Sequence, residues 1–446
     1  MEKKKTQGKA AFLKGAAWIA IGGFIAKILG AIYRIPLTNV IGGHGIGLYQ
    51  MVYPVYCLLL TVSATGIPSS ISKLTADKIG RGESGAAVFK TAIKLFLLIG
   101  VCGSVLMCLI APFLARAQGV EEITAGYYAL APSVLLVSAI SVFRGWFQGR
   151  NKMHPTALSE ITEQAVKVGF GLFFAWLFRE NVAKAVVFLL LAVSISELAA
   201  LCLMLVFYKG AKRGQKSANG GGRVAMKSVL RLSIPVTFSA ILIPLSGLLD
   251  SVLAPRLLRA YTSDSVALFG LFSGGAVTMI NLPVSVCYGI AAASVPAVAT
   301  AVAGQGKSSV RKRIFFSLFV TVAIALPSAV GLYLFAEPAT QIIFRSLKGE
   351  ELAVLVRLVR IFSVSALTLS LVQTLSACLT AQGKPQYAAL SMLLAVTVKT
   401  ALYCWWLQKP RISVYGLAYA TNVCYLIAFL LDLVYNLIVS KKSKER

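Results

Sequence analysis

The chain has 446 residues, of which 57% are hydrophobic and only 13% are charged. Soluble globular domains carry about a quarter charged residues, so this composition excludes an ordinary soluble domain and predicts an all-α protein that crosses a membrane many times. The net charge of +28 would favour nucleic acid as a partner of a soluble protein. Here the basic residues are scattered over many short loops, which argues against nucleic acid and favours contact with anionic membrane lipids.

Runs of about 20 apolar residues predict twelve membrane-spanning helices. In chain order, the predicted spans are 11–33, 46–75, 87–113, 124–148, 156–178, 184–208, 229–255, 265–302, 312–335, 352–381, 386–407 and 414–438. The basic N-terminus and its apolar run look like a signal peptide. However, Lys27 and Arg34 interrupt the run and no convincing cleavage site follows, so we expect a retained first helix.

Lysine and arginine residues concentrate in every second predicted loop. Because positively charged loops stay in the cytoplasm, this alternation predicts that both termini lie there. The longest polar linker, at 211–228, contains consecutive glycines. It divides the chain into an N-terminal six-helix lobe at 1–210 and a C-terminal six-helix lobe at 229–446.

The two halves share a short sequence pattern that follows their fourth span. The first copy reads Gln148-Gly149, Pro155, Ala157-Leu158-Ser159 and Lys167. The second copy reads Gln382-Gly383, Pro385, Ala389-Leu390-Ser391 and Lys399. The same order at the same place indicates an internal repeat, and an even number of spans per half makes the two halves parallel. Paired halves with a central site are a common plan among transporters.

Cationic residues interrupt several of the predicted spans. They are Lys27, Arg34, Lys167 and Lys399. A cation at the centre of a membrane helix costs about 3 kcal/mol or more, so several cations with few acids predict a cavity for an anionic, phosphate-bearing substrate. Lys27 and Arg34 share one helical face with Gly23 and Gly30, which favours an anion-binding wall. Alternatively, Arg34 extends its charge to the membrane surface and only Lys27 is buried.

The acidic residues within the spans leave two interpretations open. Glu163 and Lys167 lie four positions apart on one helix, where they form either a self-neutralised pair or a coupling carboxylate beside a substrate cation. Lys399 has no acid at that spacing and is expected to need an external anion. Asp250, which precedes Arg256, is expected to pair with an arginine of another helix or to bind a coupling cation.

No motif of an enzyme appears in the sequence. The two histidines, His44 and His154, lie in predicted loops, and the eight cysteines lie in apolar segments without a CxxC pair. A P-loop, a nucleophile elbow and an HExxH motif are also missing from the sequence. We therefore expect no catalytic residues, metal or cofactor, and transport that depends on gradients or on the membrane potential.

Three stretches carry a family resemblance: residues 26–77, which begin AKILGAIYRIP, FRGWFQGRNKMHPTALSEITEQAVKV at 143–168, and LDSVLAPRLL at 249–258. They resemble the stage V sporulation protein B-like branch of the polysaccharide flippases, within the multidrug/oligosaccharidyl-lipid/polysaccharide exporter superfamily. The resemblance implies a V-shaped pair of six-helix lobes that work by alternating access in a bacterial cell membrane. It also implies an undecaprenyl-pyrophosphate saccharide as substrate, either lipid II or a polysaccharide precursor, moved from the inner to the outer leaflet.

The resemblance also bears on the candidate residues. Related lipid II flippases carry cations on their first helix; Lys27 matches the first of these, and Arg34 matches the second with an offset of one residue. Many members of the branch have fourteen spans, whereas twelve are predicted here, and the additional pair holds the lipid tail in those relatives.

The favoured function is therefore a monomeric flippase whose cavity cations bind the pyrophosphate of a lipid-linked oligosaccharide. The alternative is a cation-coupled multidrug antiporter of the same fold, which should place acids rather than lysines on the cavity wall. Span one contains no acid, which counts against it. A polyprenyl-phosphate membrane glycosyltransferase would need an acid pair on a sizeable hydrophilic loop, and no predicted loop is long enough.

Overall fold

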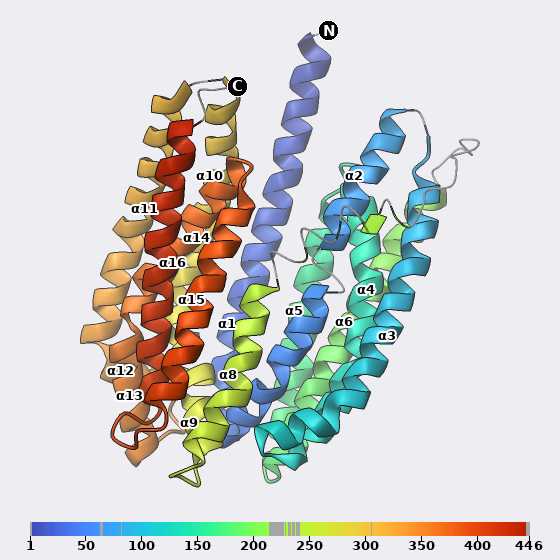
Figure 1. Ribbon diagram of the computed structural model, residues 1–446. Coiled ribbons are helices and arrows are strands. Elements are labelled where there is room, and N and C mark those ends of the chain that lie inside the picture. The colour runs from blue at the N-terminus through green and yellow to red at the C-terminus, as the bar shows by residue number, and fades with distance from the viewer. Residues whose placement is uncertain are drawn as a thin grey trace. The chain divides into compact units, whose positions relative to one another are not determined.

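The computed structural model describes residues 2–62, 66–81, 83–213, 241–304 and 306–442, together with positions 227, 229, 230, 233 and 237. Within these residues every regular element is a helix, which confirms the all-α prediction. The chain groups into two compact units, residues 1–30 with 51–245 and residues 31–50 with 246–446 (Figure 1). Most of the linker predicted at 211–228 lies outside the described residues.

The first helix, α1 (Glu2–Leu60), contributes to both units. It joins predicted span one to the first part of span two without an intervening loop. The chain bends at Gly42, whose φ of 69° and ψ of −178° are readily adopted only by glycine. Residues 31–50 around this bend belong to the second unit, a division that the predicted lobe boundaries did not include.

The first unit is built around a central helix, α4. Besides part of α1, the described helices of this unit are α2 (Gly66–Gly80), α3 (Ala86–Gln118), η2 (Glu121–Ile123), α4 (Thr124–Gln148), α5 (His154–Leu177) and α6 (Val182–Arg213). Helix α4 contacts α2, α3 and α6, and α5 packs along α6. The rings of Phe89, Phe143, Trp146 and Tyr208 pack with centroids 4.7–5.9 Å apart. This aromatic cluster fixes α3, α4 and α6 against one another.

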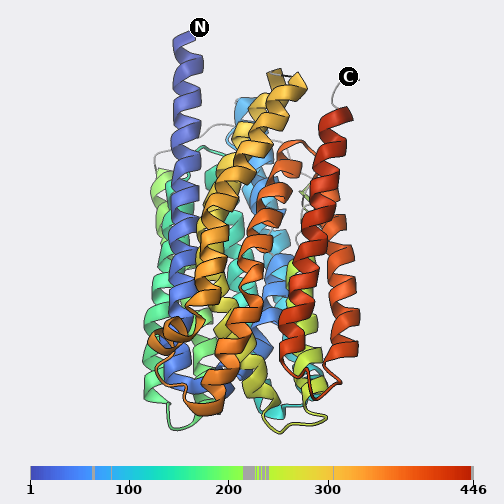
Figure 2. The same cartoon turned by 90° about the vertical axis from the view of Figure 1, so that its left-hand side faces the viewer.

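The second unit is organised around α14. Its helices are α8 (Leu242–Leu258), α9 (Ser265–Gly270), the π-helical turn η3 (Leu271–Ala276), α10 (Val277–Gly304), α11 (Gly306–Leu334), α12 (Ala336–Ile343), α13 (Gly349–Phe362), α14 (Val364–Ala381), α15 (Pro385–Trp406) and α16 (Tyr415–Lys442). Helix α14 contacts α10, α11 and α16, and α15 packs along α16. Figure 2 shows α11 in gold and α16 in red, both running the length of the unit.

Eight helices in the described part of the chain are long and apolar enough to cross a membrane, which confirms a polytopic membrane protein. Predicted spans three to six correspond to α3–α6, and spans nine, eleven and twelve correspond to α11, α15 and α16. The π-helical turn η3 divides predicted span eight, because its wider turn interrupts the regular hydrogen-bond ladder. Span ten is divided at Ser363 into α13 and α14, and the short helix α12 was not predicted.

The turns that follow α4 and α14 have the same backbone structure. In each turn a backbone N–H donates to the carbonyl oxygen five residues earlier, at 3.0 Å from Lys152 and at 2.9 Å from Lys384. The residue before each donor is left-handed, with φ of 57° at Asn151 and 73° at Gly383. This combination is the Schellman C-cap. The two turns therefore support the internal repeat that the sequence indicated.

Close backbone packing holds the bend of α1 within the second unit. A Cβ atom on Gly47 would overlap the carbonyl oxygen of Val266, and one on Gly270 would overlap the carbonyl oxygen of Gly43. Glycine at these positions lets the backbones approach more closely than any side chain allows. By contrast, a Cβ atom on Gly289 in α10 would meet nothing within 4 Å.

Candidate functional site

A polar cavity of about 350 Å³ lies within the apolar helices of the first unit. Helices α4, α5 and α6 supply its charged side chains: the guanidinium of Arg144 and the carboxyl groups of Glu160, Glu163 and Glu197. Ionisable groups inside a membrane protein are costly and commonly mark substrate or ion pathways. This cavity is therefore the first candidate site in the described residues.

Arg144 links α4 to α5 across this cavity. Its Nε atom donates to the hydroxyl oxygen of Ser159 at 2.9 Å, and its Nη2 atom donates to Oε2 of Glu163 at 3.1 Å. The Arg144 and Glu163 side chains are 14% and 18% exposed. The other oxygen of Glu163 accepts a hydrogen bond from Gln164 at 3.1 Å. Glu163 thus accepts hydrogen bonds from a guanidinium of α4 and from an amide of its own helix, and Lys167 lies one helical turn further along α5.

Glu197 is the most deeply buried acid of the cavity, with 2% exposure. Its Oε1 atom accepts a hydrogen bond from the hydroxyl of Tyr56 at 2.9 Å. Its Oε2 atom has no hydrogen-bond partner among the described residues. A buried carboxylate with an unsatisfied oxygen is unfavourable, so this position suits the gain of a proton or a cation.

The predicted substrate cations occupy different parts of the structure. Lys27 lies in α1 next to Ala26, which lines the cavity, but its side chain lies outside the described residues. Lys167 is buried in α5 with 7% exposure. Arg34 is half-buried and belongs to the second unit. The joint binding of one anion by these side chains stays a prediction.

Lys399 has an acidic partner, contrary to the expectation that it needs an external anion. Its Nζ atom lies 2.8 Å from Oδ1 of Asp250 and donates to Oδ2 at 2.8 Å and to the hydroxyl of Ser246 at 2.5 Å. The ammonium also lies 5.2 Å from the centroid of the Tyr403 ring, within range of a cation–π interaction. The expectation was wrong because the acid comes from α8, not from the helix that carries Lys399.

Asp250 therefore pairs with a lysine rather than with an arginine. Arg256, six residues further along α8, is exposed in the last turn of the helix. Arg144 was not among the residues that the sequence predicted for the site. The helical hairpin of α4 and α5 held the missing signal, because residues at similar distances from its turn come near one another. Arg144 lies five residues before the turn at 149–153, and Ser159 lies six residues after it.

The fold is similar to that of a solved membrane transporter. The inward-facing structure of a multidrug resistance MATE family transporter of the MOP superfamily superimposes with a TM-score of 0.79 at 16% sequence identity. The match covers 94% of this chain and 96% of that one. The chain therefore has the predicted fold of this superfamily of membrane transporters.

The sequence comparisons then identify the family. Residues 12–302 match the family described as polysaccharide biosynthesis protein, and the chain belongs to this family. Stage V sporulation protein B of Bacillus subtilis (strain 168) is 25% identical over 424 residues, which are 92% of this chain and 81% of the relative. Lipid II flippase MurJ of the same organism is 22% identical over 418 residues, or 87% of this chain and 76% of the relative. The resemblance to the stage V sporulation protein B-like branch is thus confirmed.

Proposed function

We propose that the protein is a flippase for a saccharide linked to undecaprenyl pyrophosphate, such as lipid II or a polysaccharide precursor. It moves this substrate from the inner to the outer leaflet by alternating access. The family and the relatives named stage V sporulation protein B and lipid II flippase MurJ support this proposal. The structural observation that carries it is a lysine, Lys167, buried to 7% exposure within an apolar helix.

In this proposal Lys27 and Lys167, which both belong to the first unit, bind the pyrophosphate group. An ammonium within the membrane costs about 3 kcal/mol, and charge-assisted hydrogen bonds to phosphate oxygens offset that cost when substrate binds. Lys399 was also a sequence candidate, but its ion pair with Asp250 favours a structural role. The polyprenyl tail stays in the surrounding lipid.

The energy for transport has two possible sources in this proposal. Outward movement of a negative charge from a negative interior is downhill by about 2.3 kcal/mol per 100 mV, so the membrane potential favours export. The cavity of the first unit supplies a coupling site as well. Glu197, with one unsatisfied oxygen, is the carboxyl group that we assign to proton or cation exchange.

The orientation belongs to the same proposal. We place both termini in the cytoplasm of a bacterial cell, because the basic segments, including the start of α11 with Arg311, Lys312 and Arg313, lie on the same predicted side as the termini. An impermeant thiol reagent applied to intact cells should leave a cysteine introduced at Lys209 unlabelled, whereas a cysteine at Arg179 should react. Labelling of the first and protection of the second would reverse the orientation.

One observation favours a second candidate function. The glutamates of the first-unit cavity are the acids that a cation-coupled multidrug antiporter would need. In that case the cavity exchanges a cationic drug for a proton or a metal cation. The family membership and the buried Lys167 argue for the flippase instead.

Reconstituted liposomes test the two candidates side by side. We expect translocation of fluorescent undecaprenyl-pyrophosphate saccharides, with little gradient-driven movement of a cationic dye. Lys27→Gln and Lys167→Gln should abolish translocation. Lys184→Gln, at an exposed lysine near the start of α6, is the matched control and should keep it. Dye transport without lipid translocation would replace the flippase by the antiporter, and full activity in both lysine variants would refute the pyrophosphate site.

A further inference from the structure

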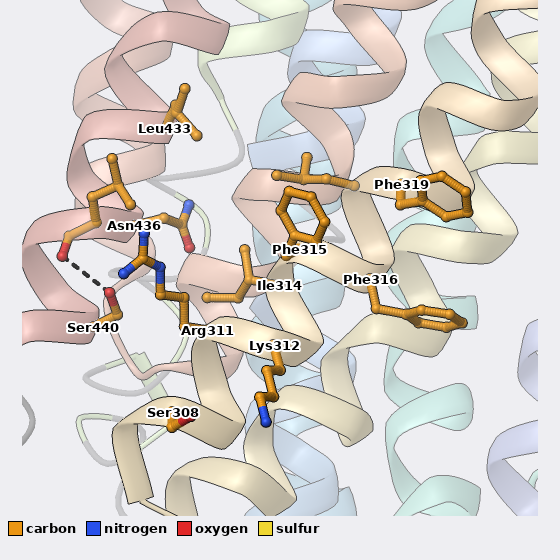
Figure 3. Close-up of a pocket in the computed structure, with 12 residues that line it drawn as sticks. Ser308, Arg311, Lys312, Ile314, Phe315, Phe316, Phe319, Leu433, Asn436 and Ser440 are labelled. Carbon is orange, nitrogen blue, oxygen red and sulfur yellow. Dashed lines mark hydrogen bonds between the residues drawn. The ribbon is translucent and has the colours of Figure 1, made fainter.

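A groove of about 1160 Å³ lies on the second unit between the start of α11 and the end of α16 (Figure 3). One part of its lining is polar and includes Arg311 and Lys312 of α11. The remainder is mainly apolar. The groove is larger than a typical pocket for a drug-sized molecule, which is roughly 300–1,000 Å³.

Three phenylalanines of α11 form the apolar wall. Phe315, Phe316 and Phe319 are 71%, 66% and 63% exposed. Leu433 and Leu437 of α16 line the same groove. On a helix of a polytopic membrane protein, rings exposed to this degree face acyl chains, since water contact would be unfavourable.

The cations lie one helical turn before the aromatic wall. Arg311 precedes Phe315 by four residues, and Lys312 precedes Phe316 by four residues, so each cation shares a helical face with a ring. Figure 3 shows Arg311 directed toward Asn436 and Ser440 of α16. Among the described lining residues none is acidic. The groove thus presents two positive charges beside an apolar surface, the arrangement that complements an amphiphile with an anionic head.

We propose that this groove binds one anionic phospholipid of the cytoplasmic leaflet. Its phosphate lies between Arg311 and Lys312, and its acyl chains lie against the phenylalanines. Charge complementarity argues for this occupant, because the cytoplasmic leaflet is rich in anionic lipids. Each Lys or Arg near the membrane surface raises the affinity for such lipids by up to about tenfold. The position of α11 on the cytoplasmic side rests on the orientation proposed above. The site itself does not depend on which substrate the protein transports.

Lipid binding by the purified full-length protein tests this site. The protein is titrated with phosphatidylglycerol, phosphatidylethanolamine and undecaprenyl phosphate, and bound lipid is counted by native mass spectrometry. Phosphatidylglycerol should bind most tightly. Arg311→Gln with Lys312→Gln should weaken its binding by about tenfold or more, while phosphatidylethanolamine changes little. Phe316→Ala should weaken both phospholipids and keep the preference for the anionic one.

The matched control removes two exposed cations from the first turns of another span. Lys90→Gln with Lys94→Gln in α3 should leave phosphatidylglycerol binding unchanged. An equal loss of phosphatidylglycerol binding in this control would show that Arg311 and Lys312 act only as general cations at the membrane surface. That result would overturn the site. Tighter binding of undecaprenyl phosphate than of phosphatidylglycerol would overturn the proposed occupant and assign the groove to the transported lipid. Size-exclusion profiles like that of the parent chain establish that each variant is folded.

Discussion

The ion pair between Lys399 and Asp250 gives the most direct test of the second unit. The Nζ atom lies 2.8 Å from both carboxylate oxygens, and the two side chains are 4% and 19% exposed. Removing one partner leaves the other charge buried, which costs about 3–5 kcal/mol, whereas removing both is close to neutral. We therefore expect Lys399→Met and Asp250→Asn each to lower the free energy of unfolding by about 3 kcal/mol, and the double variant to recover most of that loss.

Unfolding in mixed micelles measures this double-mutant cycle. Losses of about 3 kcal/mol in each single variant and about 1 kcal/mol in the double variant correspond to a coupling energy of about 5 kcal/mol. Lys384→Met is the matched control, because Lys384 is exposed beside the start of the same helix, α15. It should change the free energy of unfolding by less than about 0.5 kcal/mol. Additive losses without recovery in the double variant would refute the reasoning.

Transport by the same double variant separates structure from substrate binding. A stable and active double variant assigns the pair to structure. A stable double variant that no longer moves lipid returns Lys399 to the substrate site and contradicts the role proposed here.

Four further predictions concern single positions. Gly270→Ala should lower the free energy of unfolding by about 1–3 kcal/mol because its Cβ overlaps a carbonyl oxygen, whereas Gly289→Ala, which has room, should be neutral. Tyr56→Phe should cost about 1–3 kcal/mol by removing the hydrogen-bond donor to buried Glu197, as measured by the same unfolding assay. Glu197→Gln should fold and yet remove the dependence of transport on a proton or cation gradient. Asn151→Ala should lower the free energy of unfolding by about 1 kcal/mol, because alanine adopts the left-handed φ of 57° less readily than asparagine does. Asn151→Gly should be neutral, because glycine adopts this φ without strain.

Each of the first three has a contrary result. Equal stability of Gly270→Ala and Gly289→Ala would contradict the close approach of the backbones. An unchanged Tyr56→Phe variant would mean that Glu197 obtains no stabilisation from the phenol. Unaltered gradient dependence in Glu197→Gln would exclude that residue from coupling.

The helices and the internal repeat could be predicted because their signals are local. An apolar run has the length of a bilayer, and Pro155 and Pro385 mark two equivalent helix starts. The bend of α1 at Gly42 was harder to predict from the sequence, because the pair of glycines at 42 and 43 permits a break in the helix without requiring one. The tight contact between Gly43 and Gly270, distant in sequence, decides where the helix bends.

The ionic partners could be predicted only in part. Helical spacing reports neighbours on one helix, and Lys399 finds its acid 149 residues away on another. The pair of Arg144 and Glu163 joins α4 to α5 across 19 residues of the chain, so spacing along a single helix does not reveal it. Glu163 and Lys167 have the favourable spacing on α5, and the carboxylate also faces α4, where the guanidinium of Arg144 donates to it.

The neutral pairing of Lys399 with Asp250 has an electrical consequence. Because opposite charges lie 2.8 Å apart, a concerted displacement of α8 and α15 carries almost no gating charge through the transmembrane field. A steep voltage dependence of the transport current would then report the valence of the cargo and of any co-transported ion, and not the displacement of this pair of helices.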